Sequence, residues 1–290
     1  MKKKILIIGL TLLSFIMVVF STTIQGAQNI NELYVFGDSL SDVGNVFRAT
    51  GGNYPSSPPY FQGRYSNGPV WVEYLASQLA LTPQQNTNFA YGGATMGSSD
   101  LQVVPNLLAQ VDSFTKTHHQ VNPKALYVLW AGANDYLYGA TNNTLPIGNL
   151  SRAIQSLSKA GAQKIMVPNL PDLGNLPATR NTVNTTTFTS ITTAHNLNLS
   201  KELDVLKQKL NSDTQLIQLD VNSLYHESIQ NPAKFGFTNV TSACLSNINT
   251  CDNPSKFLFW DGIHPTTFAH QILAKVAVQT LNIRESHSSV

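Results

Sequence analysis

The chain has 290 residues, of which 42% are hydrophobic and 12% are charged, and its formal net charge is +2. This length and apolar content are enough for a full hydrophobic core in one domain. Since three of the positive charges are Lys2, Lys3 and Lys4, the rest of the chain is near neutral, which argues against a nucleic-acid partner.

The first 26 residues are predicted to be a secretory signal peptide. A basic start is followed by an apolar run over residues 5–20 and then by small and polar residues, with a cleavage position after Gly26. The alternative is an uncleaved anchor, but this run is shorter than the roughly 20 residues that a spanning helix needs. We therefore expect a signal peptide over 1–26, a single domain over 27–290 with no transmembrane segment, and a secreted or periplasmic location.

After the leader, strand-like and helix-like segments alternate. Apolar runs typical of buried strands cover 33–36, 88–91, 125–131, 164–168 and 215–219. Helical spacing of apolar residues covers 70–79, 103–114, 147–160, 191–210 and 265–281, and long irregular segments are expected over 48–68 and 231–259. This alternation predicts a three-layer α/β/α sandwich around a five-stranded, mostly parallel sheet, a flavodoxin-like α/β architecture.

A serine directly follows the first predicted strand. Residues 33–45 read LYVFGDSLSDVGN, so Ser39 lies at the carboxyl end of a buried strand, where a helix can begin. That position faces a crevice, and the N–H groups of the helix start are available to an anion. Ser39 is therefore a candidate nucleophile, although a serine at such a turn is in isolation a plain N-cap.

Possible partners of this serine lie further along the chain. In DGIHP, Asp261 precedes His264 by three residues, so its carboxylate can accept from one ring nitrogen while the other faces a serine. Gly93 in NFAYGGA and Asn134 in GAND follow the second and third predicted strands, and each offers a neutral donor suited to an oxyanion hole. Because the carboxyl ends of parallel strands meet at one edge, Ser39, Gly93 and Asn134 are expected to lie together.

The blocks GDSLSD, NFAYGGA, GAND and DGIHP resemble, in this order, the four sequence blocks of the GDSL family of lipolytic esterases, the SGNH hydrolases. The resemblance extends over residues 33–280. In addition, YFQGRYSNGPVW at 60–71 is similar to the secreted bacterial branch of lysophospholipases, phospholipases A and glycerophospholipid acyltransferases.

The family pattern implies a role for each candidate residue. Ser39 would be the nucleophile and His264 its base, oriented by Asp261. The oxyanion hole would consist of the N–H of Ser39, the N–H of Gly93 and the side chain of Asn134. No metal and no organic cofactor is implied.

The resemblance implies an exported serine ester hydrolase that releases fatty acid from lysophospholipids or phospholipids through an acyl-enzyme on Ser39. Its partners would be a lipid substrate at a membrane surface and, for acyl transfer, an alcohol acceptor. One alternative is a short-chain or carbohydrate O-acetyl esterase with the same site. A second is a non-catalytic surface binding protein, against which the intact residues at all five positions argue.

The two cysteines, Cys244 and Cys251, are expected to form a disulfide, since export leads to an oxidising compartment. The bond would act either as a structural staple or as a constraint on a loop that gates the site. Two cysteines with no nearby histidine are too few ligands for a metal. The lone histidines His195 and His270 are expected to be structural.

Overall fold

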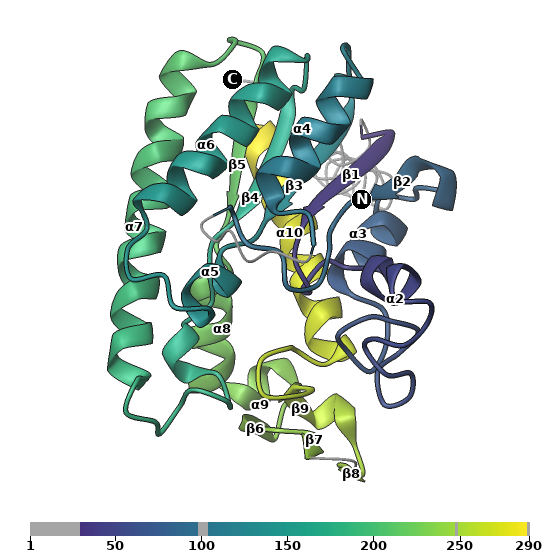
Figure 1. Ribbon diagram of the computed structural model, residues 1–290, viewed down its shortest axis with the longest axis vertical. Helices are drawn as coiled ribbons and strands as arrows, with labels where there is room; N and C mark the ends of the chain where they lie inside the picture. Colours follow the sequence, from purple (N-terminus) through teal and green to yellow (C-terminus); the bar gives the residue numbers. More distant parts are fainter. Residues whose placement is uncertain (1–29, 98–103, 247–248, 289–290) are drawn as a thin grey trace, which may run out of the picture.

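The computed structural model describes residues 30–97, 104–246 and 249–288, which form the layered arrangement in Figure 1. The expected signal peptide over residues 1–26 lies outside the described residues. Within the described ranges, no helix combines the length and the apolar character needed to cross a membrane.

A five-stranded sheet forms the centre of the molecule. Its strand order is β2-β1-β3-β4-β5, and every neighbouring pair is parallel, as the alternation of elements predicted. The strands are β1 (Glu32–Gly37), β2 (Asn86–Asn88), β3 (Ala125–Trp130), β4 (Lys164–Pro168) and β5 (Gln215–Leu219). The second strand ends three residues earlier than predicted, but the Phe89 and Tyr91 amides still donate to the Val35 and Gly37 carbonyls, so pairing with β1 continues toward Gly93.

Helices cover both faces of the sheet. They are α2 (Asn45–Ala49), α3 (Trp71–Gln78), α4 (Leu107–Thr117), α5 (Ala133–Leu137), α6 (Thr144–Lys159), α7 (Thr185–Lys209), α8 (Val221–Gln230), α9 (Pro232–Phe235) and α10 (Thr267–Ser288). Side chains alternate along each strand, so Leu33 and Val35 pack with α3 and α10, whereas Phe36 packs with α4 and α6. The two resulting cores confirm the three-layer sandwich.

Some element boundaries differ from the prediction, for identifiable reasons. Helix α7 begins six residues before the predicted start, at Thr185, because residues 185–190, TTTFTS, are almost all threonine or serine and carry no apolar period. Helix α10 begins at Thr267 rather than at Pro265, because the Thr266 hydroxyl accepts from the Ala269 amide and so caps the helix.

The segment predicted to be irregular over 231–259 is partly regular. It contains α9 and the short strands β6 (Asn239–Ala243), β7 (Leu245–Ser246), β8 (Asn249–Thr250) and β9 (Phe257–Phe259). These elements span two to five residues each, too few for a periodic pattern to emerge. The short 3-10 helices over Pro83–Gln85, Leu173–Asn175 and Pro254–Lys256 complete the described elements.

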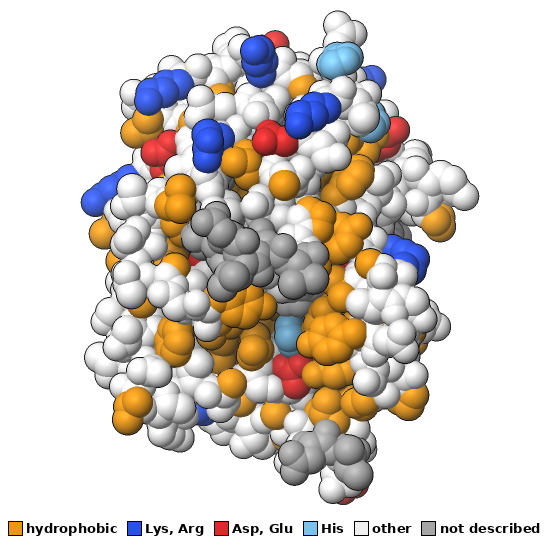
Figure 2. Space-filling model, viewed as in Figure 1, with side chains coloured by type: hydrophobic (Ala, Val, Ile, Leu, Met, Phe, Trp, Pro, Cys, Tyr) orange, Lys and Arg blue, Asp and Glu red, His pale blue; other side chains and the backbone are white. Residues whose placement is uncertain are grey.

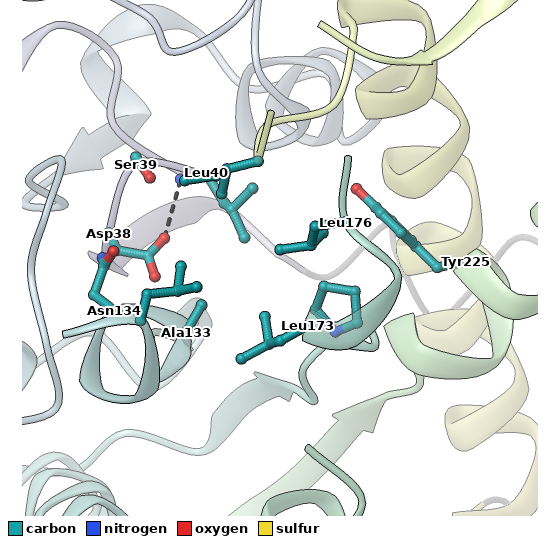
Figure 3. Close-up of a pocket in the computed structure, with 11 residues that line it drawn as sticks. Asp38, Ser39, Leu40, Ala133, Asn134, Leu173, Leu176 and Tyr225 are labelled. Carbon is teal, nitrogen blue, oxygen red and sulfur yellow. Dashed lines mark hydrogen bonds between the residues drawn. The ribbon is translucent and has the colours of Figure 1, made fainter. Parts of the chain in front are cut away.

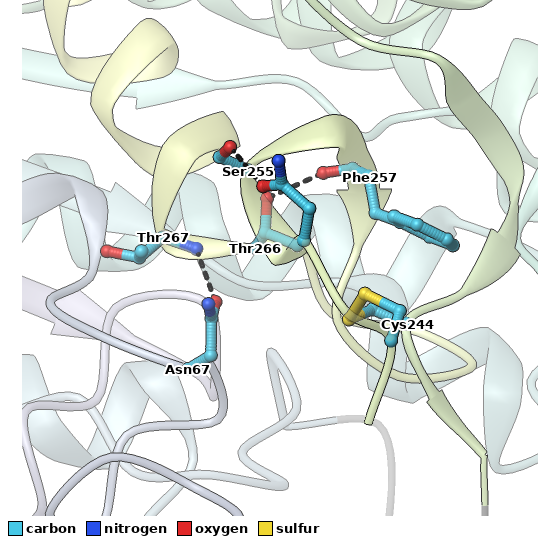
Figure 4. The surroundings of a disulfide bond; sticks show 8 residues. Asn67, Cys244, Ser255, Phe257, Thr266 and Thr267 are labelled. Atoms are coloured by element: carbon cyan, nitrogen blue, oxygen red, sulfur yellow. Dashed lines mark hydrogen bonds between the residues drawn. A yellow bond between two sulfur atoms is a disulfide. The ribbon is translucent and has the colours of Figure 1, made fainter. Parts of the chain in front are cut away.

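Cys244 and Cys251 form a disulfide, with an S–S distance of 2.01 Å (Figure 4). The Cys244 amide donates to the Phe259 carbonyl, and the Leu245 amide donates to the Trp260 carbonyl. The disulfide therefore closes a small loop that is hydrogen-bonded to the strand leading into Asp261.

Candidate active site

Ser39 lies just beyond the end of β1, in a tightly held turn. The side-chain amide of Gln110, from α4, both accepts from the Gly37 N–H at 2.8 Å and donates to the Gly37 carbonyl at 2.9 Å. A side chain at Gly37 would meet the Trp130 carbonyl oxygen at 2.2 Å, so β1 and β3 can pair this closely only with glycine there. The turn thus holds Ser39 at the carboxyl end of the central strands, as predicted.

Polar side chains around the serine turn bind the backbone. The Asp38 carboxylate accepts from the Leu40 amide at 3.0 Å, and that of Asp42 accepts from the Gly44 amide at 2.8 Å. Asp42 also accepts from the Gly92 amide at 2.9 Å, which joins the serine turn to the loop that carries Gly93. These contacts fix two of the predicted site segments relative to each other.

His264 links Ser39 to Asp261. Its Nε2 lies 2.8 Å from the Ser39 hydroxyl, although the two residues are 225 positions apart in the chain, and its Nδ1 lies 2.8 Å from the Asp261 carboxylate. Side chains in this order can move a proton from the hydroxyl to the imidazole while the carboxylate fixes the ring and its tautomer. The structure therefore brings these three predicted residues together.

The Asp261 carboxylate is suited to remain ionised. Burial alone would raise its pKa, but the charge of His264 and hydrogen bonds from His264 and from the Ile263 amide hold it at about 2. One oxygen accepts from the Ile263 and His264 amides at 2.8 and 2.7 Å. The three-residue spacing thus supplies both the side-chain contact and the local turn that orients it.

Tyr60 also contacts Asp261, and no sequence pattern indicated this. Its hydroxyl donates to the second oxygen of Asp261 at 2.7 Å. From the same segment, the ring of Tyr65 lies 5.2 Å from that of His264. Because Tyr60 and Asp261 are 201 positions apart, only the tertiary structure reveals their contact.

Of the two other predicted donors, Asn134 lines the pocket beside Ser39, and Gly93 lies in the loop that Asp42 joins to the serine turn. Gly93 has a φ of +82°, a left-handed conformation that favours glycine, and Asn134 lies in the first turn of α5. The Asn134 side-chain amide donates to the Ala94 carbonyl at 2.9 Å, and Asn134 lines the same pocket as Ser39. The segments that follow β2 and β3 therefore meet next to the serine, as expected.

An open, mostly apolar pocket adjoins Ser39. Its volume is about 370 Å³, including the part that is open to solvent, and the residues that line it are Asp38, Ser39, Leu40, Ala133, Asn134, Leu137, Pro171, Leu173, Leu176, Tyr225 and Ile263 (Figure 3). On the surface, Figure 2 shows hydrophobic side chains around a hollow in which a histidine and an acidic side chain are visible. The polar side chains of the site are therefore bordered by an apolar surface.

Asp38 is a carboxyl group in an unfavourable environment. It is 1% exposed, and burial raises its pKa to about 7, against the opposing effects of the Leu40 amide and of His264. Asp135, which is also buried, accepts from the Met96 amide at 2.8 Å.

The lone histidines have structural surroundings. The His195 Nδ1 lies 2.7 Å from the hydroxyl of Tyr136, and burial lowers the pKa of His195 to about 4. His270 is 1% exposed, and burial, together with the charge of His264, lowers its pKa to about 3. Within the described part of the chain, no group of three or more histidine, cysteine or acidic side chains is arranged to hold a metal ion.

Comparison with known proteins gives consistent matches. Residues 33–277 match the family described as GDSL-like lipase/acylhydrolase. The phosphatidylcholine-sterol acyltransferase of Aeromonas hydrophila is 29% identical over 88% of this chain and 92% of its own length. The thermolabile hemolysin of Vibrio parahaemolyticus is 28% identical over 87% of this chain, but only 64% of that protein is covered.

A solved structure supports the fold alone. A GDSL-like lipase from Parabacteroides merdae superimposes with a TM-score of 0.51, at 15% identity, over 88% of this chain and 99% of its own.

Proposed function

Since the chain belongs to the GDSL-like lipase/acylhydrolase family and is thereby a carboxylic ester hydrolase, we propose that it is an exported lipolytic enzyme that releases fatty acid from phospholipids or lysophospholipids. The observation that carries this proposal is the hydrogen-bonded chain from Ser39 through His264 to Asp261, next to an apolar pocket. The disulfide is in keeping with an oxidising compartment and so supports export.

In the proposed mechanism, the Ser39 oxygen attacks the ester carbonyl carbon while His264 Nε2 takes the hydroxyl proton. The tetrahedral intermediate collapses, the bond to the alcohol oxygen breaks, and the imidazolium gives its proton to the leaving alcohol. Water, or a second alcohol, then attacks the acyl-enzyme with His264 again as base. Asp261, ionised because of its low pKa, stabilises the imidazolium in both steps.

The negative oxygen of each tetrahedral intermediate needs preorganised donors. We assign this role to the N–H groups of Ser39 and Gly93 and to the side-chain amide of Asn134. In the free enzyme that amide donates to the Ala94 carbonyl, which holds it in place beside the pocket. Loss of one such donor typically reduces kcat by roughly 10² to 10³.

A long-chain lipid substrate is supported by two features. The pocket beside Ser39 is lined mainly by leucine, alanine, proline and isoleucine side chains, which suit an acyl chain better than a sugar. Among the relatives, the name of the phosphatidylcholine-sterol acyltransferase indicates a phospholipid substrate, and that of the thermolabile hemolysin indicates lysis of blood cells. The first name also makes an alcohol a candidate acceptor for the acyl group.

The decisive experiment measures fatty-acid release from a long-chain lysophosphatidylcholine and acetate release from a small acetyl ester, by the wild type, Ser39→Ala and Asn134→Ala. We expect the wild type to release fatty acid, Ser39→Ala to lose roughly 10⁴-fold or more, and Asn134→Ala to lose roughly 10² to 10³. Turnover of the acetyl ester alone would replace the lipid assignment by a short-chain or glycan esterase. Lipid binding without turnover of either ester would favour a binding protein.

A further inference from the structure

The far side of the pocket is formed by a single aromatic side chain. Tyr225, on α8, lines the pocket next to Ser39 and also lines a second pocket, which lies between α8, α10 and β9 and has a volume of about 200 Å³ including the part that is open to solvent. The other residues around this second pocket include Leu224, Phe237, Leu258 and Ile272, so it is apolar as well. Tyr225 is therefore shared by the linings of two apolar pockets.

An apolar path connects Ser39 to Tyr225. In Figure 3, Ser39, Asp38 and Asn134 lie at one side of the pocket and Tyr225 at the other, with Leu173 and Leu176 between them. The carbonyl of an ester must lie at Ser39, beside the polar groups that act on it. Its hydrocarbon chain is then directed along the leucines toward the tyrosine, where burial of methylene groups is favourable.

The ring of Tyr225 is held firmly enough to act as a barrier. It is only 7% exposed, and it packs edge-on against Phe259, with 6.1 Å between the ring centroids. Phe259 is itself 1% exposed and ends β9, two residues before Asp261. The ring therefore rests on the same rigid segment that carries the carboxylate of the site.

We infer that the pocket beside Ser39 binds the acyl chain of the substrate and that Tyr225 is its end wall, which limits the length of acyl chain the enzyme accepts. This inference rests on the proposed ester hydrolysis. A chain longer than the pocket has to leave methylene groups in water or bend out of the opening. Removal of the ring would join the two pockets and allow those groups to be buried.

The test compares kcat/KM for p-nitrophenyl acetate, octanoate and palmitate in the wild type, Tyr225→Ala, Tyr225→Leu and Tyr225→Phe. We expect the palmitate-to-octanoate ratio to rise at least 10-fold in Tyr225→Ala and less in Tyr225→Leu, since each further buried methylene contributes about fourfold. Tyr225→Phe keeps the ring and should retain the wild-type ratio.

Thermal unfolding of each variant establishes whether it is folded. Leu157→Ala, a truncation in the core on the other face of the sheet, serves as a control for lost stability and should leave the ratio unchanged. The end-wall role of Tyr225 would be overturned, with the proposed function left intact, by either of two results. One is a wild-type palmitate-to-octanoate ratio in folded Tyr225→Ala or Tyr225→Leu. The other is a rise of that ratio in Tyr225→Phe as large as in Tyr225→Ala. Absence of Ser39-dependent turnover of every ester would overturn the proposed function together with it.

Discussion

At the scale of single residues, the contact between Tyr60 and Asp261 extends the chain of hydrogen bonds beyond the predicted serine, histidine and aspartate. Asp261 accepts from His264, from two backbone amides and from Tyr60, so all of its acceptor directions are used. A carboxylate restrained on every side keeps one orientation as the imidazole gains and loses its proton. Tyr60 is therefore a positioning residue for Asp261.

Replacement of Tyr60 by phenylalanine is expected to lower kcat by roughly 10-fold and to move the acidic limb of the pH profile of kcat/KM to higher pH. The reason is that a carboxylate that has lost a donor orients the His264 ring less firmly, and that its negative charge, no longer shared with Tyr60, stabilises the protonated imidazole more strongly. Steady-state kinetics between pH 4 and pH 9 measure both effects. Tyr54→Phe is the control, since Tyr54 lies in the same segment and is 58% exposed. A reduced melting temperature with an unshifted pH profile would show that Tyr60 only stabilises the fold.

Asp38 is expected to make the stability of the protein depend on pH in an identifiable window. Its pKa is 3.8 in the unfolded chain and about 7 in the folded protein, so the folded state favours the protonated form. The corresponding stability is present below pH 4, is lost between about pH 4 and pH 7, and does not change further above that. Asp38→Asn keeps an acceptor for the Leu40 amide but cannot ionise.

Urea unfolding of the wild type and Asp38→Asn across this range measures the effect. The unfolding free energy of Asp38→Asn relative to the wild type should increase with pH up to about pH 7 and then become constant. Two curves that run parallel over the whole range would contradict the raised pKa.

At the scale of elements, the disulfide connects a surface loop with the strand that leads to Asp261. The Cys244 and Leu245 amides donate to the Phe259 and Trp260 carbonyls, directly before Asp261 in the chain. Cys244 is 3% exposed, so this end of the loop belongs to the packed interior. A change in the loop can therefore reach the carboxylate through two backbone hydrogen bonds.

Cys244→Ser combined with Cys251→Ser is expected to lower ester hydrolysis at temperatures where the protein is still folded, because the strand before Asp261 is less restrained. The loss of stability should be about 2.5 kcal/mol or less, as chain entropy predicts for so small a loop. Activity assays and thermal unfolding of the double variant test this. A large shift in melting temperature with unaltered activity would leave the disulfide as a staple only.

At the scale of the whole molecule, the site depends on the packing of residues 67–69 against Thr267, which lies about 200 positions further along the chain. Asn67 accepts from the Thr267 amide, and the Thr267 hydroxyl donates to the Pro69 carbonyl (Figure 4 shows the first contact). Gly68, between these partners, lies against the side chain of Thr267. This contact fixes the start of α10, just after His264, onto the segment that leads into α3.

Gly68→Ala is expected to destabilise the protein by roughly 1–3 kcal/mol, since its added carbon would lie 2.6 to 2.9 Å from atoms of Thr267 in a packed region. The matched control is Gly148→Ala in α6, where the same carbon meets nothing within 4 Å and alanine favours the helix. Chemical unfolding of both variants measures the difference. Equal unfolding free energies of Gly68→Ala and Gly148→Ala would contradict the close packing of Gly68 against Thr267.

The features that depend on local pattern and spacing could be predicted from the amino-acid sequence. The alternation of elements predicted the parallel sheet, and the positions directly after three strands predicted that Ser39, Gly93 and Asn134 would lie together. The spacing of Asp261 and His264 predicted their contact, because three residues suffice for a turn. The short elements within 231–259 and the early start of α7 were not predicted, because short strands and a threonine-rich first turn leave no periodic signal.

The contacts between residues far apart in the chain became apparent only in the folded structure. The partnership of Tyr60 with Asp261, the Gln110 clamp on Gly37 and the position of Tyr225 between two pockets each join distant segments. Such contacts depend on how the layers pack and on which side chains reach across them. No local pattern in a single sequence predicts such a contact, because a tyrosine or a glutamine at a given position could hydrogen-bond to, or pack against, many other side chains.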